Sequence, residues 1–471
     1  MGSERDYVIE RTGIYPRGFS LKTEWPWPLV QSAEIVTLHY GKALRATERV
    51  HGSVPVYGTN GQCGWHNESL QQGPGVILGR KGQGPLGVKW CDTEFWVIDT
   101  AYFVQQMSEN INLRYFFYVV NFIGLNHLKD GTSNPSLSRD TFTRLLIPLP
   151  PMEHQKAIAH ILSTLDDKIE LNRQMNMTLE SMAQAMFKSW FVDFDPVIDN
   201  ALTAGNPIPE PLKASAENRR RLGDQRKPLP QDIQKLFPDR FVFSEEFGWT
   251  PEGWEVSTVG DQVKTAGGGT PSTKDNSYWD GGVHAFCTPK DMSRLNSIVM
   301  TDTERHLTDA GVNKISSGQL KAGVVLMSSR APIGYLAISN IPVSVNQGII
   351  AMIPSEKYGS MYLHLWAHFN MRQITDRANG STFMEISKKN FRPIPFLVPE
   401  DMILKYFNDQ SHSIYLKLLS ISENVVELTN LRDTLLPKLI SGQLRLPDSL
   451  INKFAEQADS HDAEQIISEA I

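Results

Sequence analysis

The side chains best suited to chemistry in this sequence are polar and cationic groups in expected loops, which in the first half of the chain are rich in glycine. In the first half of the chain they are Asn60, Gln62, His66, Asn67, Arg80, Lys81 and Gln83. In the second half they are Lys290, Arg330, Asn346, Gln347, Asn379 and Ser381. Asn and Gln can form paired hydrogen bonds with adenine, Arg can do so with guanine, and Lys suits a phosphate. The pattern predicts loops that contact DNA, although each residue could also be an ordinary loop residue.

Sequence motifs for catalysis are missing. Residues 267–274 contain glycine and lysine in the wrong order and spacing for a phosphate-binding GxxxxGK[ST] loop. Residues 134–137, Asn-Pro-Ser-Leu, come nearest to the Asp/Asn-Pro-Pro-aromatic corner of an amino-methylating enzyme, but lack the second proline and the aromatic ring. The histidines are scattered, and neither HExxH nor a Cys/His cluster of metal-ligand spacing occurs. We therefore expect a non-catalytic binding protein with no cofactor and no metal of its own.

The composition is that of a globular protein. The 471 residues, of which 41% are apolar and 21% charged, predict two or three domains. No run of about 18 apolar residues occurs, and charged residues are frequent among the first ten. Neither a membrane span nor a signal peptide is therefore expected. Cys63, Cys91 and Cys287 are odd in number and far apart, which argues against a disulfide framework. A cytoplasmic location fits these features.

The net charge of −6 argues against a DNA partner only if the charge is spread evenly. Residues 27–140 contain nine acidic and nine basic side chains, and residues 251–390 contain twelve acidic and thirteen basic ones. The excess of acid lies instead in residues 151–195 and in the tail from residue 448 onward. DNA binding thus remains compatible with the charge, but near-neutral domains predict weak binding by this chain alone.

The sequence contains an internal repeat, which is the strongest indication of its architecture. Trp27 begins a pattern that recurs 227 residues later at Trp254, residues 75–78 recur 248 residues later, and residues 138–142 recur 249 residues later. The growing offset predicts an insertion in the second copy around residues 291–321. Each copy consists of short β-like runs followed by a proline and a long amphipathic stretch.

The amphipathic stretches predict two helices of about 40 residues, roughly 60 Å each. In the first, one heptad position holds Ile158, Leu165, Asn172, Leu179 and Met186, and the other holds Ile161, Lys168, Met175, Met182 and Ser189. In the second, Phe407, Ile414, Ile421, Leu428 and Leu435 recur 249 residues after the first set. We expect the helices to pair antiparallel between two globular domains, as a dumbbell with pseudo-twofold symmetry. The alternative is that each helix packs only on its own domain.

The stretch between the copies, residues 196–250, is rich in proline and glycine and predicts a partly ordered linker. Its basic run at residues 219–227 could touch phosphates, but a solvated charge cluster is the commoner case.

Several segments carry a family resemblance. Residues 151–176 and 182–197 strongly resemble the central conserved region of type I restriction-modification specificity subunits, residues 435–445 resemble their C-terminal conserved region, and residues 247–254 resemble the entry to their second recognition domain. The resemblance implies an α+β fold with two α/β target recognition domains joined by a pair of long antiparallel helices. The corresponding ranges are an N-terminal extension at 1–26, a recognition domain at 27–150, a helical region at 151–195, the linker at 196–250, a recognition domain at 251–399, a helical region at 400–447 and an acidic tail at 448–471.

The resemblance also implies a function. The chain would bind a bipartite, asymmetric sequence in double-stranded DNA, one part per recognition domain, with the helices setting the gap. Two modification subunits, which bring S-adenosylmethionine and methylate adenine N6, would dock on the helices, and restriction subunits that use ATP and Mg²⁺ would join them. The candidate docking residues are Gln155, Asp166, Lys168, Asn172, Met186, Trp190, Phe191, Lys417, Leu428 and Leu435. Two alternatives are a coiled-coil scaffold with protein-binding heads and a self-sufficient modification enzyme.

Overall fold

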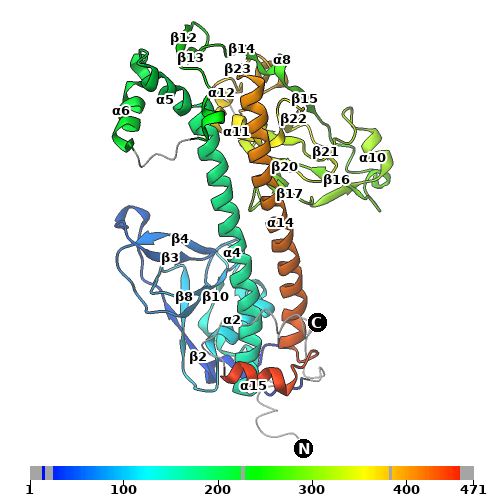
Figure 1. Ribbon diagram of the computed structural model, residues 1–471. Helices are drawn as coiled ribbons and strands as arrows, with labels where there is room; N and C mark the ends of the chain where they lie inside the picture. Colours follow the sequence, from blue (N-terminus) through cyan, green and yellow to red (C-terminus); the bar gives the residue numbers. More distant parts are fainter. Residues whose placement is uncertain (1–12, 16–24, 224–228, 381–383, 457–471) are drawn as a thin grey trace, which may run out of the picture. The chain divides into compact units, whose positions relative to one another are not determined.

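The computed structural model describes residues 13–15, 25–223, 229–380 and 384–456 (Figure 1). Internal contacts divide the chain into two compact units, Met1–Ile169 with Glu427–Ile471 as unit 1 and Glu170–Val426 as unit 2. Two helices of 40 residues each, α4 (Met152–Phe191) and α14 (Asp401–Ile440), contribute a part to both units. The predicted pair of long helices is therefore confirmed.

Unit 1 contains a four-stranded sheet of order β2-β8-β5-β6, a three-stranded sheet of order β4-β3-β7 and two strand pairs, β1 with β11 and β9 with β10. Its strands are β1 (Leu29–Gln31), β2 (Val36–Tyr40), β3 (Val54–Gly58), β4 (Gly61–His66), β5 (Gly75–Gly79), β6 (Val88–Cys91), β7 (Trp96–Val97), β8 (Ala101–Gln106), β9 (Lys129–Asp130), β10 (Ser136–Leu137) and β11 (Leu146–Pro148). The short helices are η1 (Ser32–Glu34), η2 (Ala46–Glu48), η3 (Asn126–Leu128) and α3 (Arg139–Thr143).

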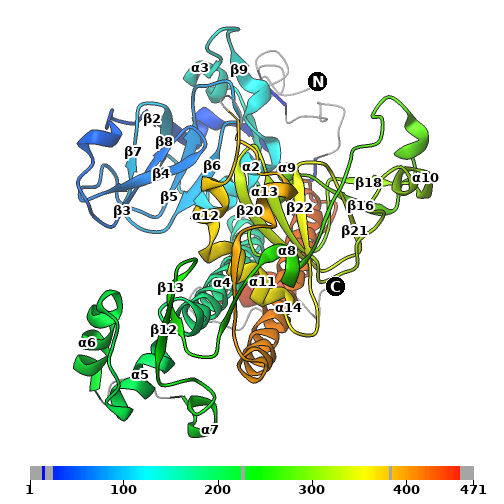
Figure 2. The ribbon, with the colours of Figure 1, turned by 90° about the horizontal axis from the view of Figure 1, so that it is seen from above.

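Helix α2 (Leu113–Ile123) packs on β5 and β6 of the four-stranded sheet (Figure 2). The side chain of Asn112 accepts a hydrogen bond from the backbone of Tyr115 and caps the helix, which ends at Gly124 with a positive φ of 69°. The core of unit 1 forms between this helix, the sheet and the first turns of α4.

Unit 2 contains a five-stranded sheet of order β15-β22-β19-β20-β17, a three-stranded sheet of order β18-β16-β21 and two strand pairs, β12 with β13 and β14 with β23. Its strands are β12 (Phe241–Ser244), β13 (Gly248–Pro251), β14 (Glu255–Thr258), β15 (Lys264–Gly267), β16 (His284–Cys287), β17 (Val299–Met300), β18 (Arg305–Leu307), β19 (Val325–Ser329), β20 (Ile333–Ser339), β21 (Val343–Val345), β22 (Ile349–Ile353) and β23 (Pro395–Val398). The helices beside the sheets are α8 (Val259–Gln262), η6 (Asn276–Tyr278), α9 (Pro289–Met292), α10 (Asp309–Asn313), α11 (Ser360–Phe369), α12 (Met371–Asp376) and α13 (Lys388–Phe391).

The two units repeat one strand order, which confirms the internal duplication and the α+β class. Strands β2, β8, β5 and β6 correspond to β15, β22, β19 and β20, and the parallel pair of β3 and β7 corresponds to that of β16 and β21. The register corrects the predicted alignment by one residue. Leu78 of β5 pairs with Tyr102 of β8, and Met327 of β19 pairs with Ile350, the equivalent residue of β22. The equivalent positions in β5 and β19 therefore lie 249 residues apart rather than 248.

The insertion predicted around residues 291–321 is also present. The turn between β3 and β4 consists of Thr59 and Asn60, whereas residues 288–304 separate β16 from β18 and contain α9 and β17. Helix α10 adds a further excursion between β18 and β19. The extra strand β17 pairs parallel with β20 at the end of the sheet, so the insertion enlarges the sheet without changing the repeated order.

The long helices contact one another inside each unit. The contacting pairs are Asp166 with Arg432 in unit 1, and Asn176 with Ser422 and Trp190 with Tyr406 in unit 2. In unit 2 the residue number rises along α4 as it falls along α14, so the two helices are antiparallel there. Both helices also pack on the sheet of unit 2, so the alternative in which each helix packs only on its own domain captures just part of the arrangement.

One of the predicted heptad positions is wrong in the second half of α4. Met175 and Met182 are 46% and 55% exposed, whereas Asn176 and Ala183, one residue later in each case, are buried. The buried face shifts because the helix packs on the sheet domain as well as on α14, and Phe187 continues this face into the aromatic core.

The predicted linker forms helices and a hairpin in the part of the chain that the structure describes. These elements are α5 (Asp195–Ala204), η4 (Glu210–Leu212), α6 (Lys213–Leu222), α7 (Gln231–Gln234) and the β12–β13 hairpin. Arg219 of the basic run is largely buried and bonds to Asp195 and Asp199. This arginine is therefore neutralised inside unit 2.

The beginning of the acidic tail is helical. Helix α15 (Asp448–Glu456) places Ile451 and Phe454 in the core of unit 1, and the Phe454 ring lies 4.6 Å from that of His160. At the N-terminal end, Ile14 forms a bridge with Leu145.

Candidate nucleic-acid interface

In unit 1 the loops that follow β2, β3, β5 and β7 meet at one edge, which we call the loop edge of unit 1. The Thr59 hydroxyl donates to the carbonyl oxygens of Lys81 (2.7 Å) and Thr100 (3.1 Å), which joins three of these loops. The Gly87 N–H donates to the Thr59 carbonyl at 2.8 Å, so the loop after β5 folds back over the β3–β4 turn. Asn60 stands exposed in that turn.

Cations gather at the loop edge of unit 1. The guanidinium carbons of Arg80 and Arg139 both lie 4.6 Å from the ring centroid of Tyr40, which is 47% exposed. Arg80 also donates to the Asp99 carbonyl at 2.9 Å, and the Lys81 ammonium lies 2.9 Å from the Asp99 carboxylate. Stacking on an aromatic face holds a guanidinium in place without neutralising its charge. The edge therefore presents fixed positive charge beside an exposed ring.

The neighbouring hairpin between β9 and β10 completes this edge. Gln83 donates from its amide to the Ser133 carbonyl at 2.9 Å. The Lys129 ammonium donates to the carbonyl oxygens of Gly82 (3.2 Å) and Gly84 (3.0 Å). These bonds hold the glycine-rich loop of residues 80–87 against the hairpin and fix its backbone.

The loop edge of unit 2 forms at the same place in the repeated fold. Arg330 follows β19 and lies 3.5 Å from the Glu385 carboxylate, and Glu385 in turn pairs through its backbone with Asn379. The Asn346 side chain accepts a hydrogen bond from Gly348 at 2.9 Å. Gln347 is exposed and accepts a hydrogen bond from the Thr270 hydroxyl at 2.7 Å. Arg330, Asn346, Gln347 and Asn379 are thus brought to one edge, as Asn60, Arg80, Lys81 and Gln83 are in unit 1.

Lys290 stands on α9, beside this edge, in an ion-pair cluster. It lies 2.9 Å from the Glu304 carboxylate, which Arg294 also contacts at 2.6 Å. The hydrogen bond from Lys290 is the main cause that lowers the pKa of Glu304. Lys290 is 60% exposed, so it stays accessible although it is paired.

Two of the candidate residues, His66 and Asn67, lie at the end of the β3–β4 hairpin opposite the loop edge of unit 1. His66 is only 6% exposed, its Nδ1 accepts a hydrogen bond from the Val50 N–H at 3.0 Å, and its ring packs on Trp96. Its side chain is therefore part of the domain interior and is not available to DNA. Asn67 is exposed next to it, at the end of the β3–β4 hairpin away from the turn, and Gln62 is exposed on β4 itself. Ser381 lies outside the described residues.

Sequence reasoning missed Arg139 and Lys388. Both are exposed, and each is the first residue of a short helix whose preceding serine caps it. The repeat had aligned the two segments, residues 138–142 and 387–391, but their helical positions gave no reason to place them at the loop edges. Only the fold shows that α3 begins directly after β10 in unit 1, and that α13 begins shortly after the bridge of Glu385 with Asn379 in unit 2.

Several candidate docking residues are internal. Gln155 is fully buried and its amide donates to the carbonyl oxygens of Asn110 and Pro150, while Asp166 accepts bonds from Tyr118 and Arg432. Trp190 and Phe191 are 4% and 8% exposed and belong to the aromatic core of unit 2. The surface role expected for Gln155, Trp190 and Phe191 is therefore wrong, because Gln155 is buried inside unit 1 and the two aromatic side chains are buried inside unit 2.

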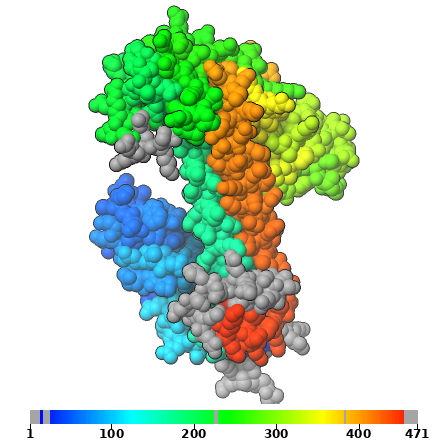
Figure 3. Space-filling view, viewed as in Figure 1, coloured from blue at the N-terminus to red at the C-terminus, as the bar shows by residue number. Residues whose placement is uncertain are grey.

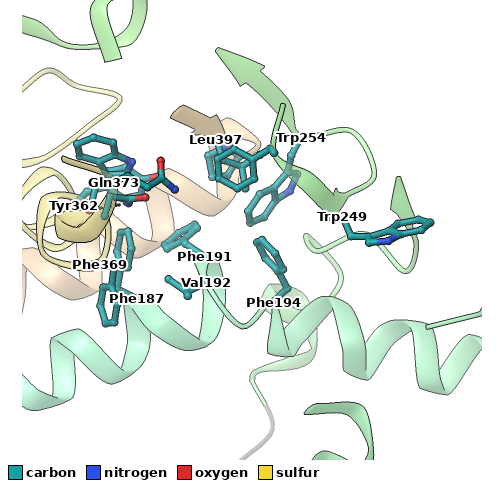
Figure 4. A pocket seen from close by; sticks show the side chains of 14 residues that line it. Phe187, Phe191, Val192, Phe194, Trp249, Trp254, Tyr362, Phe369, Gln373 and Leu397 are labelled. Carbon is teal, nitrogen blue, oxygen red and sulfur yellow. Dashed lines mark hydrogen bonds between the residues drawn. The ribbon is translucent and has the colours of Figure 1, made fainter. Parts of the chain in front are cut away.

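Phe191 also lines a cavity of about 270 Å³ at the end of α4 (Figure 4). Aromatic side chains surround it, with Phe187 and Phe194 from the α4 region and Trp254 and Tyr362 from the rest of unit 2. None of the candidate DNA-binding residues lines this cavity.

The remaining docking candidates differ in exposure. Lys417 is exposed, and the partly exposed ones are Lys168, Asn172, Met186, Leu428 and Leu435. The structure contains more exposed apolar groups on α4 than expected. Leu171, Met175 and Met182 are 57%, 46% and 55% exposed and lie at helical spacings of four and seven residues, so they form one stripe.

Across the described ranges no three histidine, cysteine, aspartate or glutamate side chains come together as a metal site would require. Over the same ranges, none of the helices combines the length and apolar character needed to cross a bilayer.

Two units of one strand order, each with its own polar loop edge, define an internally duplicated α+β protein. A family model described as the type I restriction modification DNA specificity domain matches residues 26–181 and again residues 251–420. The chain therefore belongs to the type I restriction-modification DNA specificity family.

Individual relatives agree with this assignment. The HindI specificity subunit of Haemophilus influenzae is 30% identical over 385 residues, which cover 75% of this chain and 82% of the relative. The MjaIX specificity subunit of Methanocaldococcus jannaschii is 36% identical over 188 residues, or 37% of this chain and 43% of the relative. The crystal structure of a type I S subunit from M. genitalium aligns with a TM-score of 0.52 at 15% identity, covering 90% of this chain and 99% of that one, and supports the fold alone.

Proposed function

We propose that this chain selects the DNA sequence on which a type I restriction-modification complex acts, and that each unit binds one part of a bipartite, asymmetric target. The observation that carries the proposal is the pair of loop edges. They occupy the same place in a repeated fold, yet they present different side chains, such as Asp99 in unit 1 where unit 2 has Gln347. A repeated fold whose two loop edges carry different side chains is suited to two half-sites of different sequence.

The helices α4 and α14 then set the unspecified gap between the half-sites. Each unit contains a part of both helices. In this proposal, an insertion of equal length into α4 and α14 therefore changes the distance between the half-sites that the two units bind. A matched insertion of one heptad into each helix should lengthen the gap and leave both half-sites unchanged. A changed half-site with an unchanged gap would contradict the role of the helices as a ruler.

Catalysis is assigned to partner subunits. Two modification subunits would bring S-adenosylmethionine and methylate adenine N6, and restriction subunits would bring ATP and Mg²⁺, while this chain contributes no catalytic residue. The exposed stripe of Leu171, Met175 and Met182 on α4 supports docking there, because contiguous apolar groups on a surface helix favour a protein partner. Parts of both helices reach the surface in the space-filling view (Figure 3).

The docking stripe can be tested with a control on the same helix. Met177 is 64% exposed but lies on a different face of α4. Met175→Glu and Met182→Glu should abolish co-purification with the modification subunits, whereas Met177→Glu should not. Equal effects of all three substitutions, or none, would exclude the stripe as the docking site.

The function itself is tested by sequencing the methylated bases of cells that carry this chain with its modification subunits. A gapped adenine motif that disappears when this chain is deleted is the expected result. Methylation that persists without the chain, or a motif without a gap, would refute the proposed function.

A further inference from the structure

The strand register within each unit shows which positions at the two loop edges are equivalent in the repeated fold. Tyr40 pairs with Tyr102 in unit 1 as Gly267 pairs with Ile350 in unit 2, which makes Tyr40 and Gly267 equivalent. The backbone N–H groups two residues further on, in Lys42 and Gly269, donate to the carbonyl oxygens of Val97 and Val345 and confirm the match.

The loops after β5 and β19 correspond in the same way. The Leu137 N–H donates to Arg80 and the Ile386 N–H donates to Ser329, which makes Arg80 equivalent to Ser329. The next residues, Lys81 and Arg330, are therefore also equivalent. Counting on from Leu137 and Ile386 makes Arg139 equivalent to Lys388, 249 residues apart.

Arg139 and Lys388 lie over the same position of the sheet. The Arg139 guanidinium carbon is 4.6 Å from the centroid of the Tyr40 ring. The Lys388 ammonium lies over Gly267, 3.0 Å from the point where a side chain at that glycine would begin. A cation therefore reaches the same place in both units, although the residue beneath it is tyrosine in one and glycine in the other.

Neither cation is neutralised within the part of the chain that the structure describes. Lys81 pairs with Asp99 and Arg330 pairs with Glu385, but Arg139 and Lys388 have no carboxylate partner among the described residues. Each is the first residue of a short helix, where the backbone dipole favours an acidic rather than a basic side chain. Neither ion pairing nor the helix dipole therefore accounts for a cation at both positions.

We propose that Arg139 and Lys388 are equivalent contacts to the DNA phosphate backbone, one for each half-site, and that they contribute affinity without sequence preference. The assignment rests on the proposed function. The two half-sites differ in their bases but share the phosphate backbone, so a group kept at both edges is suited to the shared part. Positions that differ, such as Asp99 and Gln347, remain for reading bases.

The test measures binding of the full-length chain to a duplex of random sequence by fluorescence anisotropy over a range of salt concentrations. Each phosphate contact contributes about 0.9 to the slope of log affinity against log salt, so Arg139→Ala and Lys388→Ala should each lower the slope by about one. The affinity should fall roughly five-fold at ~0.15 M salt and roughly fifteen-fold at ~0.05 M salt. The double variant should lose about two units of slope, while Arg139→Lys and Lys388→Arg should keep it.

The repeat supplies a matched control. Lys156 and Lys405 are also 249 residues apart and exposed, on the first turns of α4 and α14. Lys156 follows Gln155, which bonds to residues just beyond the far end of β8, so this position lies away from the loop edge of unit 1. Lys156→Ala and Lys405→Ala should leave the slope unchanged.

Three results would overturn the assignment. An unchanged slope in both alanine variants, with normal binding by the unsubstituted chain, would exclude phosphate contacts and leave the proposed function intact. A changed sequence preference in a selection from random duplexes would instead make these side chains base readers. A chain without any salt-dependent affinity for duplex DNA would refute the assignment together with the proposed DNA-binding role.

Discussion

Asp166 joins three elements of unit 1, and its replacement makes a quantitative test of how α4 and α14 are held together. Its carboxylate accepts a hydrogen bond of 2.6 Å from the Tyr118 hydroxyl on α2 and one of 2.8 Å from Arg432 on α14. Tyr118 is 2% exposed, and burial is the main cause that raises the pKa of its hydroxyl. The Asp166→Ala substitution would leave this hydroxyl without its acceptor.

The two bonds should not contribute equally. A hydrogen bond to a charged group contributes about 1.5–3 kcal/mol, and the buried Tyr118 bond belongs in that range. The side chains of Asp166 and Arg432 are 24% and 28% exposed, and Arg432 keeps a second partner in Asp433, so this ion pair should contribute only about 1 kcal/mol. Asp166→Ala should therefore destabilise unit 1 by about 2.5–4 kcal/mol.

Hydrogen exchange is the suitable assay because it reports each segment separately. Protection should fall in α2 and in residues 427–440 of unit 1 and stay unchanged in the sheets of unit 2. Double-mutant cycles with Tyr118→Phe and Arg432→Met should give the larger coupling energy for the tyrosine, and only the arginine coupling should weaken at high salt.

Asp167→Ala is the matched control, because Asp167 is adjacent, 77% exposed and no closer than 3.9 Å to Arg114. It should cost less than about 0.5 kcal/mol. An Asp166→Ala variant no less stable than this control, or zero coupling to both partners, would refute the reasoning.

Three further predictions concern unit 2. His364 is 3% exposed, and burial, aided by the nearby His368, lowers its pKa to about 4. The folded chain holds this imidazole neutral, so the free energy of unfolding should be highest above pH ~6.5 and should fall by about 3 kcal/mol as the pH drops through 4. The melting temperature of His364→Phe, measured against pH, should show a smaller loss in acid. Burial raises the pKa of Glu180, whose Oε1 accepts a hydrogen bond from the Ile298 N–H at 3.0 Å. The contribution of Glu180 to the free energy of unfolding is therefore complete below its pKa in the unfolded chain and is lost as the pH rises through its pKa in the folded chain. Glu180→Gln keeps the acceptor without the charge, so this variant should melt at a higher temperature than the unsubstituted chain at pH 8, but not at pH 4. A side chain at Gly268 would begin 1.6 Å from the Val345 carbonyl oxygen, whereas nothing lies within 4 Å of one at Gly269; Gly268→Ala should lower the unfolding free energy by at least ~2 kcal/mol and Gly269→Ala by less than ~0.5, and equal denaturant midpoints would contradict this.

Repetition made the fold predictable from the sequence. Two copies of one pattern had to form the same strands, and a change in their offset located the insertion that adds β17 and α10. The long helices followed from their apolar periodicity. The seam between them was less predictable, because periodicity shows that a helix has a buried face but not whether a sheet or another helix covers it. The heptad pattern therefore predicts that Met175 and Met182 lie between the two helices, although both are exposed.

The sites were harder to predict, since residue type does not reveal direction. Trp190 and Phe191 stand on a helix that resembles a docking region, but they point into the aromatic core of unit 2. His66 stands in a glycine-rich stretch beside exposed neighbours and yet bonds to the Val50 backbone. In both cases the local sequence pattern describes a segment and does not show in which direction a side chain points.

The same limit explains why Arg139 and Lys388 emerged only from the fold. From the sequence alone, neither the start of a short helix nor the alignment of an Arg with a Lys shows that these residues lie at the loop edges. The sheet register gives the pair its meaning, because it places both cations over one position of the first strand, above Tyr40 in one unit and Gly267 in the other. A duplicated fold thus separates two kinds of position at its loop edges. Residues that differ between equivalent sites can serve different sequences, and residues that stay alike must serve what the two sites have in common.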